Sequence, residues 1–507
     1  MCARRGFVLA ALLALSAMPL AMPAAGQPTT RPATPLSLDT LAGMYRTELG
    51  PLFDPASLAK LYHAHQLLEQ YFSADSTDQR KAIVQQLNAT GLAPPILGRL
   101  ARLRMYWQKL EPGVYFINDK IGPHAVRYFL GVPRGYDLSQ SWPLVVKLPT
   151  ANAFLTDPPP DADAVTRIYT QWIDDELADH PDALVLMPLL NLDELYGPGA
   201  IGMNLVMQPI LHAAGQANID PARVYLIGHS MAAHAVWNIA IHYPTYFAAI
   251  NPLAGAANEV WQRIRLGDLR NVLAVVWHDA SDTVIKVDES RAIVRYLRGM
   301  KYDVDYQETQ SMGHAPTAQL LEQEYGKMRA RTRALYPTEL FVQSDSPDTI
   351  FNRIDWLQIY QPLDPGPLSK LLFAHGSGGI SIYRNGFRAV AGLGASNTIS
   401  IDAVNVQTLR IYLNDQMVDL SKPVTVRVNG KARFSDLVPQ SVDEMLKDQL
   451  FLGRGWRYFT AIIDLDLTEP TSQPSSQPAS RPTHHTPIRY TTPDGQEHIY
   501  VPHDSGD

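Results

Sequence analysis

The middle of the chain alternates between short, largely apolar runs and longer segments whose apolar residues recur at helical spacing. Runs that predict buried strands occur at 125–133, 144–148, 183–187, 223–227, 247–250, 272–277 and 304–308. Segments with a helical pattern fall between them, at 164–178, 200–216, 231–242, 287–299 and 316–334. Apolar strands separated by helices are typical of a mostly parallel sheet that is covered on both faces. We therefore expect an α/β domain over residues 112–337.

The segments on either side of this region follow other patterns. Between 38 and 111 apolar residues recur every three or four positions, which predicts a helical N-terminal region. After Pro337 the chain consists of short β-rich runs, and Asn429-Gly430 between two of them is a strong hairpin signal. We expect residues 338–467 to form a small, mainly antiparallel β domain of the sandwich type.

The two ends of the chain have the composition of processed or flexible segments. Arg4 and Arg5 precede an apolar stretch, and Ala24-Ala25-Gly26 supplies the small residues of a cleavage site. This favours a signal peptide over residues 1–26 rather than a membrane anchor, since the apolar stretch is short and contains prolines. We expect a secreted or periplasmic protein. Residues 27–37 and 468–507, rich in Pro, Thr and Ser, are expected to be a disordered leader and a flexible tail.

Composition narrows the classes of function. The 507 residues carry a net charge of -7, which argues against a nucleic-acid partner. The single cysteine, Cys2, would leave with the signal peptide, so we expect neither disulfides nor thiol chemistry. No further segment is apolar for long enough to span a membrane. The sequence carries no zinc, phosphate-loop or dinucleotide motif, so we expect no metal and no cofactor.

A short glycine-serine motif at the end of one predicted strand carries the strongest chemical signal. Gly228-His229-Ser230 follows an apolar strand and is followed at once by a helical pattern. This is the layout of a nucleophile elbow, in which the serine sits on a sharp strand-to-helix turn. Ala232 stands where a second glycine is usual, and one methyl group is compatible with such a turn.

An acid and a histidine follow this serine in the order that a catalytic triad on this kind of sheet requires. Asp282 lies in the loop after strand 272–277, and His314 lies in the loop after strand 304–308. His314 would act as the general base for Ser230, and Asp282 would orient its imidazole. Asp279 competes with Asp282 as the acid or serves as a turn residue.

These motifs resemble the secreted esterases grouped with polyhydroxybutyrate depolymerases and feruloyl esterases, whose relatives include prolyl-oligopeptidase-type hydrolases. The resemblance covers about 112–330. The residues that carry it are 220–231, His242-Tyr243-Pro244, Phe247-Ala248-Ala249, the acid loop 278–284 and the Gly313-His314 pair. It implies the α/β-hydrolase fold and an ester substrate, small or polymer-linked. Asp279 departs from the pattern, because the family has glycine there.

The resemblance also implies an oxyanion hole, and the chain departs from the family on one side of it. The Met231 amide would supply the first donor. The family's strand ends in Leu-His-Gly, whereas here Leu148 is followed by Pro149-Thr150-Ala151. The second donor would then come from Thr150 or Ala151. Losing one such donor costs about 3–4 kcal/mol of transition-state stabilisation.

The remaining polar motifs predict structure more than chemistry. Trp277, His278 and His229 are expected to pack at strand ends and beside the nucleophile, and His234 to be structural or to line the pocket. The loop 375–379 and His484-His485 carry no site signal. The leading hypothesis is an exported serine esterase without a cofactor. The alternatives are a prolyl-oligopeptidase-type peptidase and a catalytically degenerate module that binds a glycan or a protein.

Overall fold

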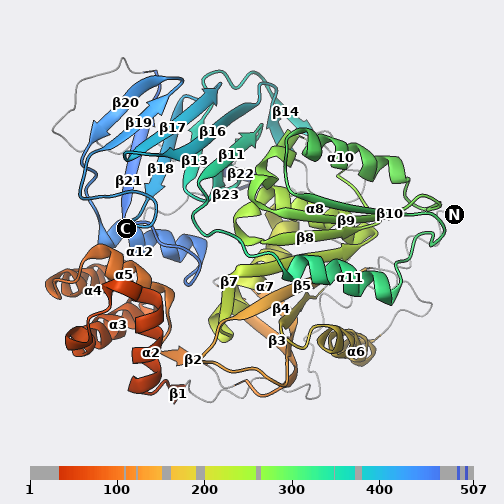
Figure 1. The fold of residues 1–507 in the computed structure, drawn as a ribbon, viewed down its shortest axis with the longest axis horizontal. Helices are drawn as coiled ribbons and strands as arrows, with labels where there is room; N and C mark the ends of the chain where they lie inside the picture. The colour runs from red at the N-terminus through yellow and green to blue at the C-terminus, as the bar shows by residue number, and fades with distance from the viewer. Residues whose placement is uncertain are drawn as a thin grey trace. The chain divides into compact units, whose positions relative to one another are not determined.

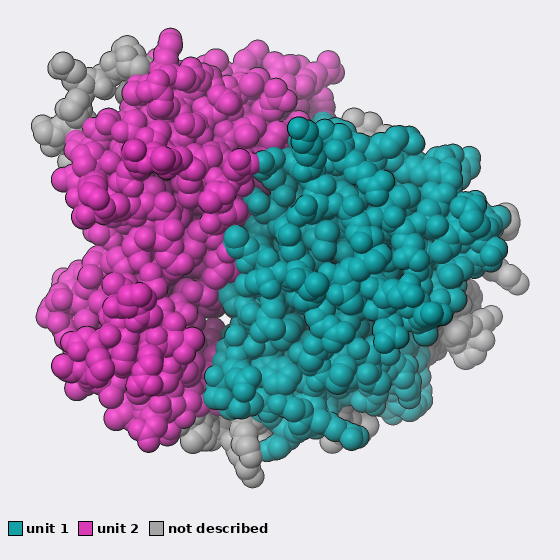
Figure 2. Space-filling model, viewed as in Figure 1, with its two compact units in different colours: residues 1–33, 108–334, 371–380 teal, residues 34–107, 335–370, 381–507 magenta. Residues whose placement is uncertain are grey.

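The structure is a computed structural model that describes residues 34–107, 110–121, 124–150, 161–189, 200–257, 264–347, 349–371, 380–468, 488–491 and 497–500. The predicted signal peptide, Ala151, loop 375–379 and His484-His485 lie outside these residues. The described chain forms two compact units (Figure 2). Among the described residues, one unit holds those between 108 and 334 together with 371 and 380, and the other holds 34–107, 335–370 and those from 381 onward.

The first unit is built on one eight-stranded sheet (Figure 1). In spatial order its strands are β10 (Val304–Thr309), β9 (Leu273–Asp279), β8 (Ala249–Leu253), β7 (Ile219–His229), β5 (Trp142–Leu148), β6 (Leu184–Pro188), β4 (His124–Val132) and β3 (Gly113–Ile121). The strands from β10 to β6 are parallel to their neighbours, and β4 and β3 add an antiparallel edge. This is the mostly parallel sheet that the sequence predicts, in the strand order of α/β-hydrolases. The sequence pattern does not predict β3, because its C-terminal end is polar.

Helices cover both faces of this sheet, as the apolar strands require. They are α6 (Ala162–Asp179), α7 (Ala200–Gln216), α8 (Met231–His242), α10 (Val287–Gly299) and α11 (Ala318–Arg329). Two successive residues of β4 point to opposite faces of the sheet and contact helices on each side. Tyr128 hydrogen-bonds with His212 of α7 at 2.9 Å, whereas Phe129 stacks on Tyr169 of α6 with ring centroids 4.7 Å apart. The predicted α/β-hydrolase fold class is confirmed.

A partly buried ion cluster lies under the α6 face of the sheet. Lys147 Nζ of β5 is 2.7 Å from Glu176 Oε1, and His180 Nε2 is 3.2 Å from Glu176 Oε2. Burial by itself would raise the pKa of Glu176, but the neighbouring Lys147 and His180 outweigh it and lower the pKa to about 2. Glu176 is therefore a carboxylate that stabilises the folded state at neutral pH.

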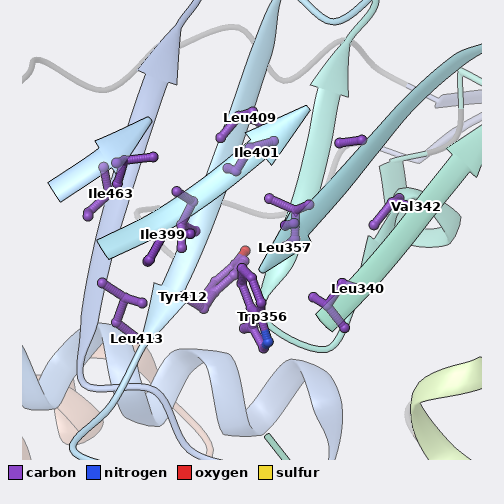
Figure 3. Packing of buried hydrophobic residues seen from close by; sticks show 14 of the residues in the cluster. Leu340, Val342, Trp356, Leu357, Ile399, Ile401, Leu409, Tyr412, Leu413 and Ile463 are labelled. Carbon is purple, nitrogen blue, oxygen red and sulfur yellow. The ribbon is translucent and has the colours of Figure 1, made fainter. Parts of the chain in front are cut away.

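The second unit contains a β-sandwich and the N-terminal helices. Its two main sheets have the orders β11-β16-β17-β19-β20 and β12-β13-β18-β21. These strands span Glu339–Ser344, Phe387–Gly394, Thr398–Val404, Val424–Val428 and Lys431–Asp436, then Arg353–Ile354, Leu357–Gln361, Thr408–Leu413 and Ala461–Asp466. Leu340 and Ile399 of one sheet and Leu357 and Leu409 of the other share one apolar core (Figure 3). Asn429-Gly430 forms the predicted hairpin turn, both residues with positive φ.

The N-terminal helices and the C-terminal region, which the sequence pattern separates, share a second core. The helices are α2 (Leu38–Leu49), α3 (Leu58–Ser73), α4 (Thr77–Ala89) and α5 (Pro94–Arg102). They pack around Met445 and Leu446 of α12 (Val442–Leu452). Arg454 adds a bidentate ion pair to Glu69, at 2.7 and 2.9 Å. The helical region is therefore part of the same unit as the sandwich.

The segments at the two ends of the described chain carry short strands. Thr34–Pro35 (β1) pairs with Tyr106–Trp107 (β2), and Ile488–Thr491 (β22) pairs with Glu497–Tyr500 (β23). Among the described residues, no helix is both long enough and apolar enough to cross a membrane.

Candidate active site

Ser230 lies on the sharp turn between β7 and α8, where the sequence predicts a nucleophile elbow. Its φ of 59° and ψ of -121° are unusual for a residue with a side chain. Such strain persists only where the surroundings enforce it, and it is common at reactive residues. The Ser230 amide donates to the carbonyl of Leu253 on β8 at 2.9 Å, which ties the turn to the neighbouring strand.

Two glycines make room for this turn. A Cβ added to Gly228 would lie 2.5 Å from the Ala232 carbonyl oxygen, and one added to Gly255 would lie 2.9 Å from the Ser230 carbonyl oxygen. Side chains at either position would push α8 away from the strand ends. Ala232, which replaces the usual second glycine, is fully buried at the start of α8.

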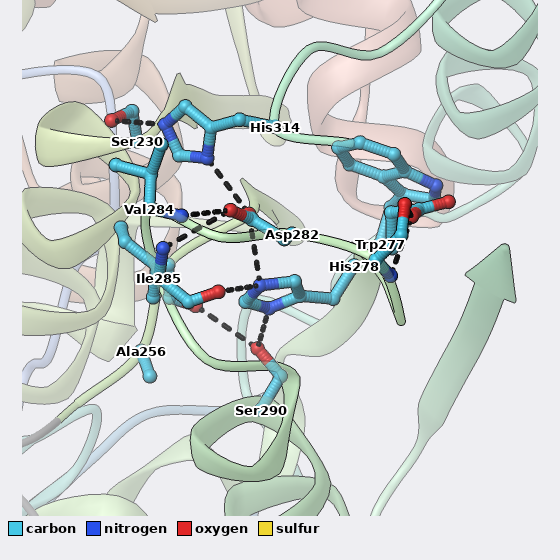
Figure 4. A network of polar contacts seen from close by, with 12 residues as sticks. Ser230, Ala256, Trp277, His278, Asp282, Val284, Ile285, Ser290 and His314 are labelled. Carbon is cyan, nitrogen blue, oxygen red and sulfur yellow. Dashed lines mark hydrogen bonds and ion pairs between the residues drawn. The ribbon is translucent and has the colours of Figure 1, made fainter. Parts of the chain in front are cut away.

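The structure brings the three predicted triad residues into one hydrogen-bonded line (Figure 4). His314 Nε2 is 2.8 Å from Ser230 Oγ, and His314 Nδ1 is 2.7 Å from Asp282 Oδ2. An ionised carboxylate can only accept, so Nδ1 carries the proton and Nε2 is left as an acceptor for the Ser230 hydroxyl. In this tautomer His314 can take the serine proton.

Asp282 is held by donors on both carboxylate oxygens. The amides of Val284 and Ile285 donate to Oδ1 at 2.8 and 3.1 Å, while His314 donates to Oδ2. Burial by itself would raise the pKa of Asp282, but the hydrogen bonds from His314, Ile285 and Val284 outweigh it and lower the pKa below its usual value. Asp282 is therefore a carboxylate at neutral pH.

A second histidine, His278, lies behind Asp282 and is completely buried. Its Nε2 is 3.2 Å from Asp282 Oδ2 and 2.9 Å from the Ile285 carbonyl oxygen, so Nε2 faces two acceptors and must carry a proton. Its Nδ1 is 2.7 Å from Ser290 Oγ. The sequence suggested only packing for this residue. The one available signal was its position at the end of β9, four residues before Asp282.

Asp279, the other candidate acid, does not contact His314. Its Oδ1 accepts hydrogen bonds from the amide and hydroxyl of Ser281, and its Oδ2 accepts from the Thr309 hydroxyl and the Met312 amide. These bonds hold the pKa of Asp279 well below its usual range, although burial by itself would raise it. Of the two carboxylates, the structure places only Asp282 against the imidazole.

The histidines near the nucleophile are held by backbone groups. His229 Nε2 donates to the carbonyl of His314 at 2.7 Å, and the two rings lie 4.9 Å apart. Burial lowers the pKa of His229, which favours the neutral form of its ring. His234 Nδ1 contacts the Ala256 carbonyl at 2.5 Å. His229 therefore supports the backbone that carries the base.

The two sides of the predicted oxyanion hole differ in what the structure describes. Met231 is the first residue of α8, so its amide is one of the helix N-terminal donors without an intrahelical partner. Leu148, the last residue of β5, pairs with Gly228 beside the turn, and Thr150 lies two residues beyond it. Ala151 lies outside the described residues. No group of three potential metal ligands occurs in the part of the chain that the structure describes.

No family model and no curated protein matches this chain. Solved structures that resemble it include a thermostable esterase, with 21% identity, 43% of this chain and 63% of that chain covered, and a TM-score of 0.36. Esterase PE8 has 18% identity, coverage of 38% and 94%, and a TM-score of 0.28. A ferulic acid esterase has 12% identity, coverage of 43% and 95%, and a TM-score of 0.31.

The chain thus spans less than two thirds of the thermostable esterase and nearly all of the other two. These matches say nothing about the chemistry of the site.

Proposed function

We propose that this protein is a serine hydrolase that cleaves carboxylic esters through an acyl-enzyme intermediate. The observation that carries the proposal is the line from Ser230 Oγ to His314 Nε2, at 2.8 Å, and from His314 Nδ1 to Asp282, at 2.7 Å. A serine hydroxyl is a weak nucleophile until an adjacent base can take its proton. Here the base is within reach and is itself oriented by a carboxylate.

The reaction follows from these three groups. Ser230 Oγ attacks the ester carbonyl carbon while its proton passes to His314 Nε2. The tetrahedral intermediate then collapses, the bond to the alcohol oxygen breaks, and His314 protonates the departing alcohol. Water enters, gives a proton to His314 and attacks the acyl carbon. The second collapse releases the carboxylic acid and returns the proton to Ser230. Asp282 stabilises the imidazolium in both steps.

The negative oxygen of each intermediate needs donors. In this proposal the Met231 amide, at the N-terminus of α8, supplies the first, where the helix dipole also favours negative charge. The amide of Thr150 or Ala151 supplies the second, since β5 ends beside the turn that carries Ser230.

The surface beside the triad favours an apolar group in the substrate. Three large apolar side chains are exposed in the described part of this unit, and two of them lie on the catalytic loops. Val284 is 66% exposed, two residues after Asp282, and Met312 is 39% exposed, two residues before His314. Covering such side chains with an acyl or alcohol chain contributes about 0.8 kcal/mol per buried methylene.

Turnover of short-chain p-nitrophenyl esters tests the proposal. We expect wild type to hydrolyse them and Ser230→Ala to fall to the background rate. Ser141→Ala, at an exposed serine of the same unit, should remain as active as wild type. Equal turnover by wild type and Ser230→Ala would refute the proposal. A panel of proline-containing peptides in the same assay separates ester from peptide specificity.

A further inference from the structure

The acid loop and the histidine loop leave the sheet side by side. Asp279 and Thr309 are the last paired residues of β9 and β10, and the amide of Ala280 donates to the Thr309 carbonyl at 2.7 Å. Beyond this pair, one loop continues to Asp282 and the other to His314. Only the first few residues of each loop are therefore held by the sheet itself.

The side chain of Asp279 joins the two loops beyond the last strand pair. Its Oδ1 accepts from the amide and hydroxyl of Ser281, at 2.8 and 2.5 Å, in the acid loop. Its Oδ2 accepts from Thr309 Oγ1 at 2.5 Å and from the Met312 amide at 2.9 Å, in the histidine loop. Trp277 Nε1 donates in turn to Thr309 Oγ1 at 3.1 Å.

The two amides that donate to Asp279 belong to residues one or two positions before a triad residue. Ser281 immediately precedes Asp282. Met312 is separated from His314 by Gly313 alone, which adopts a left-handed backbone conformation with a φ of 71°. A shift of either amide would therefore change the 2.7 Å contact between His314 Nδ1 and Asp282 Oδ2.

We propose that Asp279 is a positioning residue whose carboxylate holds the acid loop and the histidine loop at the separation that the triad needs. This inference rests on the proposed function. It gives a role to a residue that the sequence reading left as a turn residue or an alternative acid.

The charge of Asp279 is essential to this role because all four of its partners donate. A carboxylate accepts on both oxygens, whereas an asparagine presents an N–H on one side. In Asp279→Asn that N–H would face either the Met312 amide or the Ser281 amide, and donor would oppose donor. A buried donor left without an acceptor disfavours the local arrangement. The isosteric change should therefore separate the loops without creating a cavity.

Steady-state kinetics on p-nitrophenyl acetate, combined with proton NMR, tests the inference. We expect Asp279→Asn to lower kcat about 10- to 100-fold, the range for a displacement near 1 Å, with KM within about twofold. We also expect the low-field resonance of the His314 Nδ1 proton to broaden or disappear. Asp305→Asn, at a half-exposed carboxylate of the neighbouring strand β10 that pairs with Lys327, is the control and should change neither.

A pair of substitutions at Thr309 guards against misfolding of the first variant. Thr309→Val removes the hydroxyl donor at nearly constant volume, and Thr309→Ser restores it. We expect Thr309→Val to reproduce part of the loss in kcat and Thr309→Ser to keep the wild-type kcat. If Thr309 acted only by packing, Thr309→Val would keep the wild-type kcat as well.

The inference would be overturned if folded Asp279→Asn kept a kcat within twofold of wild type and kept the low-field resonance unchanged. If wild type itself hydrolyses no ester, the proposed function fails. The NMR resonance in wild type and in Asp279→Asn still decides whether this carboxylate positions the imidazole.

Discussion

Replacing His278 by phenylalanine removes the buried ring nitrogens behind Asp282 and leaves a side chain of similar size. Asp282 Oδ2 then loses the group at 3.2 Å, and the Ile285 carbonyl loses its donor at 2.9 Å. The hydrogen bond to the Ile285 carbonyl contributes about 0.5–1.5 kcal/mol, and a buried carbonyl left without its donor costs about 1–3 kcal/mol. We expect the free energy of unfolding to fall by about 1–3 kcal/mol.

The effect of the His278 substitution on catalysis should be smaller than the loss of the acid itself. Asp282 keeps the amides of Val284 and Ile285 and the bond to His314, so it stays ionised but is less firmly oriented. We expect kcat to fall about tenfold, which corresponds to about 1.4 kcal/mol. Complete loss of a triad aspartate costs about 10⁴-fold in serine proteases, which sets the upper bound.

The assay for the His278 prediction is kcat on p-nitrophenyl acetate at a temperature where urea denaturation shows each variant to be folded. His278→Gln keeps a donor near the position of Nε2 and should recover most of the rate. His242→Phe, at a second buried histidine of the same unit, should lose stability but keep kcat. A folded His278→Phe variant with the wild-type kcat would refute the claim that His278 orients Asp282.

Three further predictions concern stability, the elbow and specificity. Because Lys147 and His180 outweigh burial and lower the pKa of Glu176 from its ordinary value of 4.5 to about 2, we expect Glu176→Gln to lose roughly 3 kcal/mol at pH 7. This difference should be present above pH 4.5 and shrink as the pH falls toward 2, as urea titrations would show. Gly255→Ala should lower kcat at least tenfold, because its Cβ would lie 2.6 Å from Ala233 Cβ, whereas Gly299→Ala, with nothing within 4 Å, should not. Val284→Ser and Met312→Ser should each reduce the preference for a butyrate over an acetate ester, by at most about tenfold.

The parts of the site that depend on local sequence could be predicted from the sequence. The elbow at Ser230 is recognisable because an apolar strand, a glycine and a helix adjoin within a few residues. Asp282 and His314 could be found because each follows a strand of the sheet, and parallel strands end at the same edge. The fold class followed for the same reason.

The parts that depend on contacts between distant segments could not be predicted. Asp279 and Asp282 lie three positions apart in one loop, and only the tertiary structure shows which carboxylate meets the imidazole. His278 follows an apolar run, as an ordinary residue at a strand end does. Met445 joins the core of the N-terminal helices from the far end of the chain, and nothing in the local pattern of either segment indicates this.

Covalent labelling with a fluorophosphonate, followed by mass spectrometry of the peptides, tests the central claim most directly. The reagent reacts with a serine only where a neighbouring base activates the hydroxyl. We expect one phosphonyl group per chain, attached to Ser230, with esterase activity lost in proportion to labelling and no labelling of His314→Ala. Labelling at another serine, or full activity in protein labelled at Ser230, would contradict it.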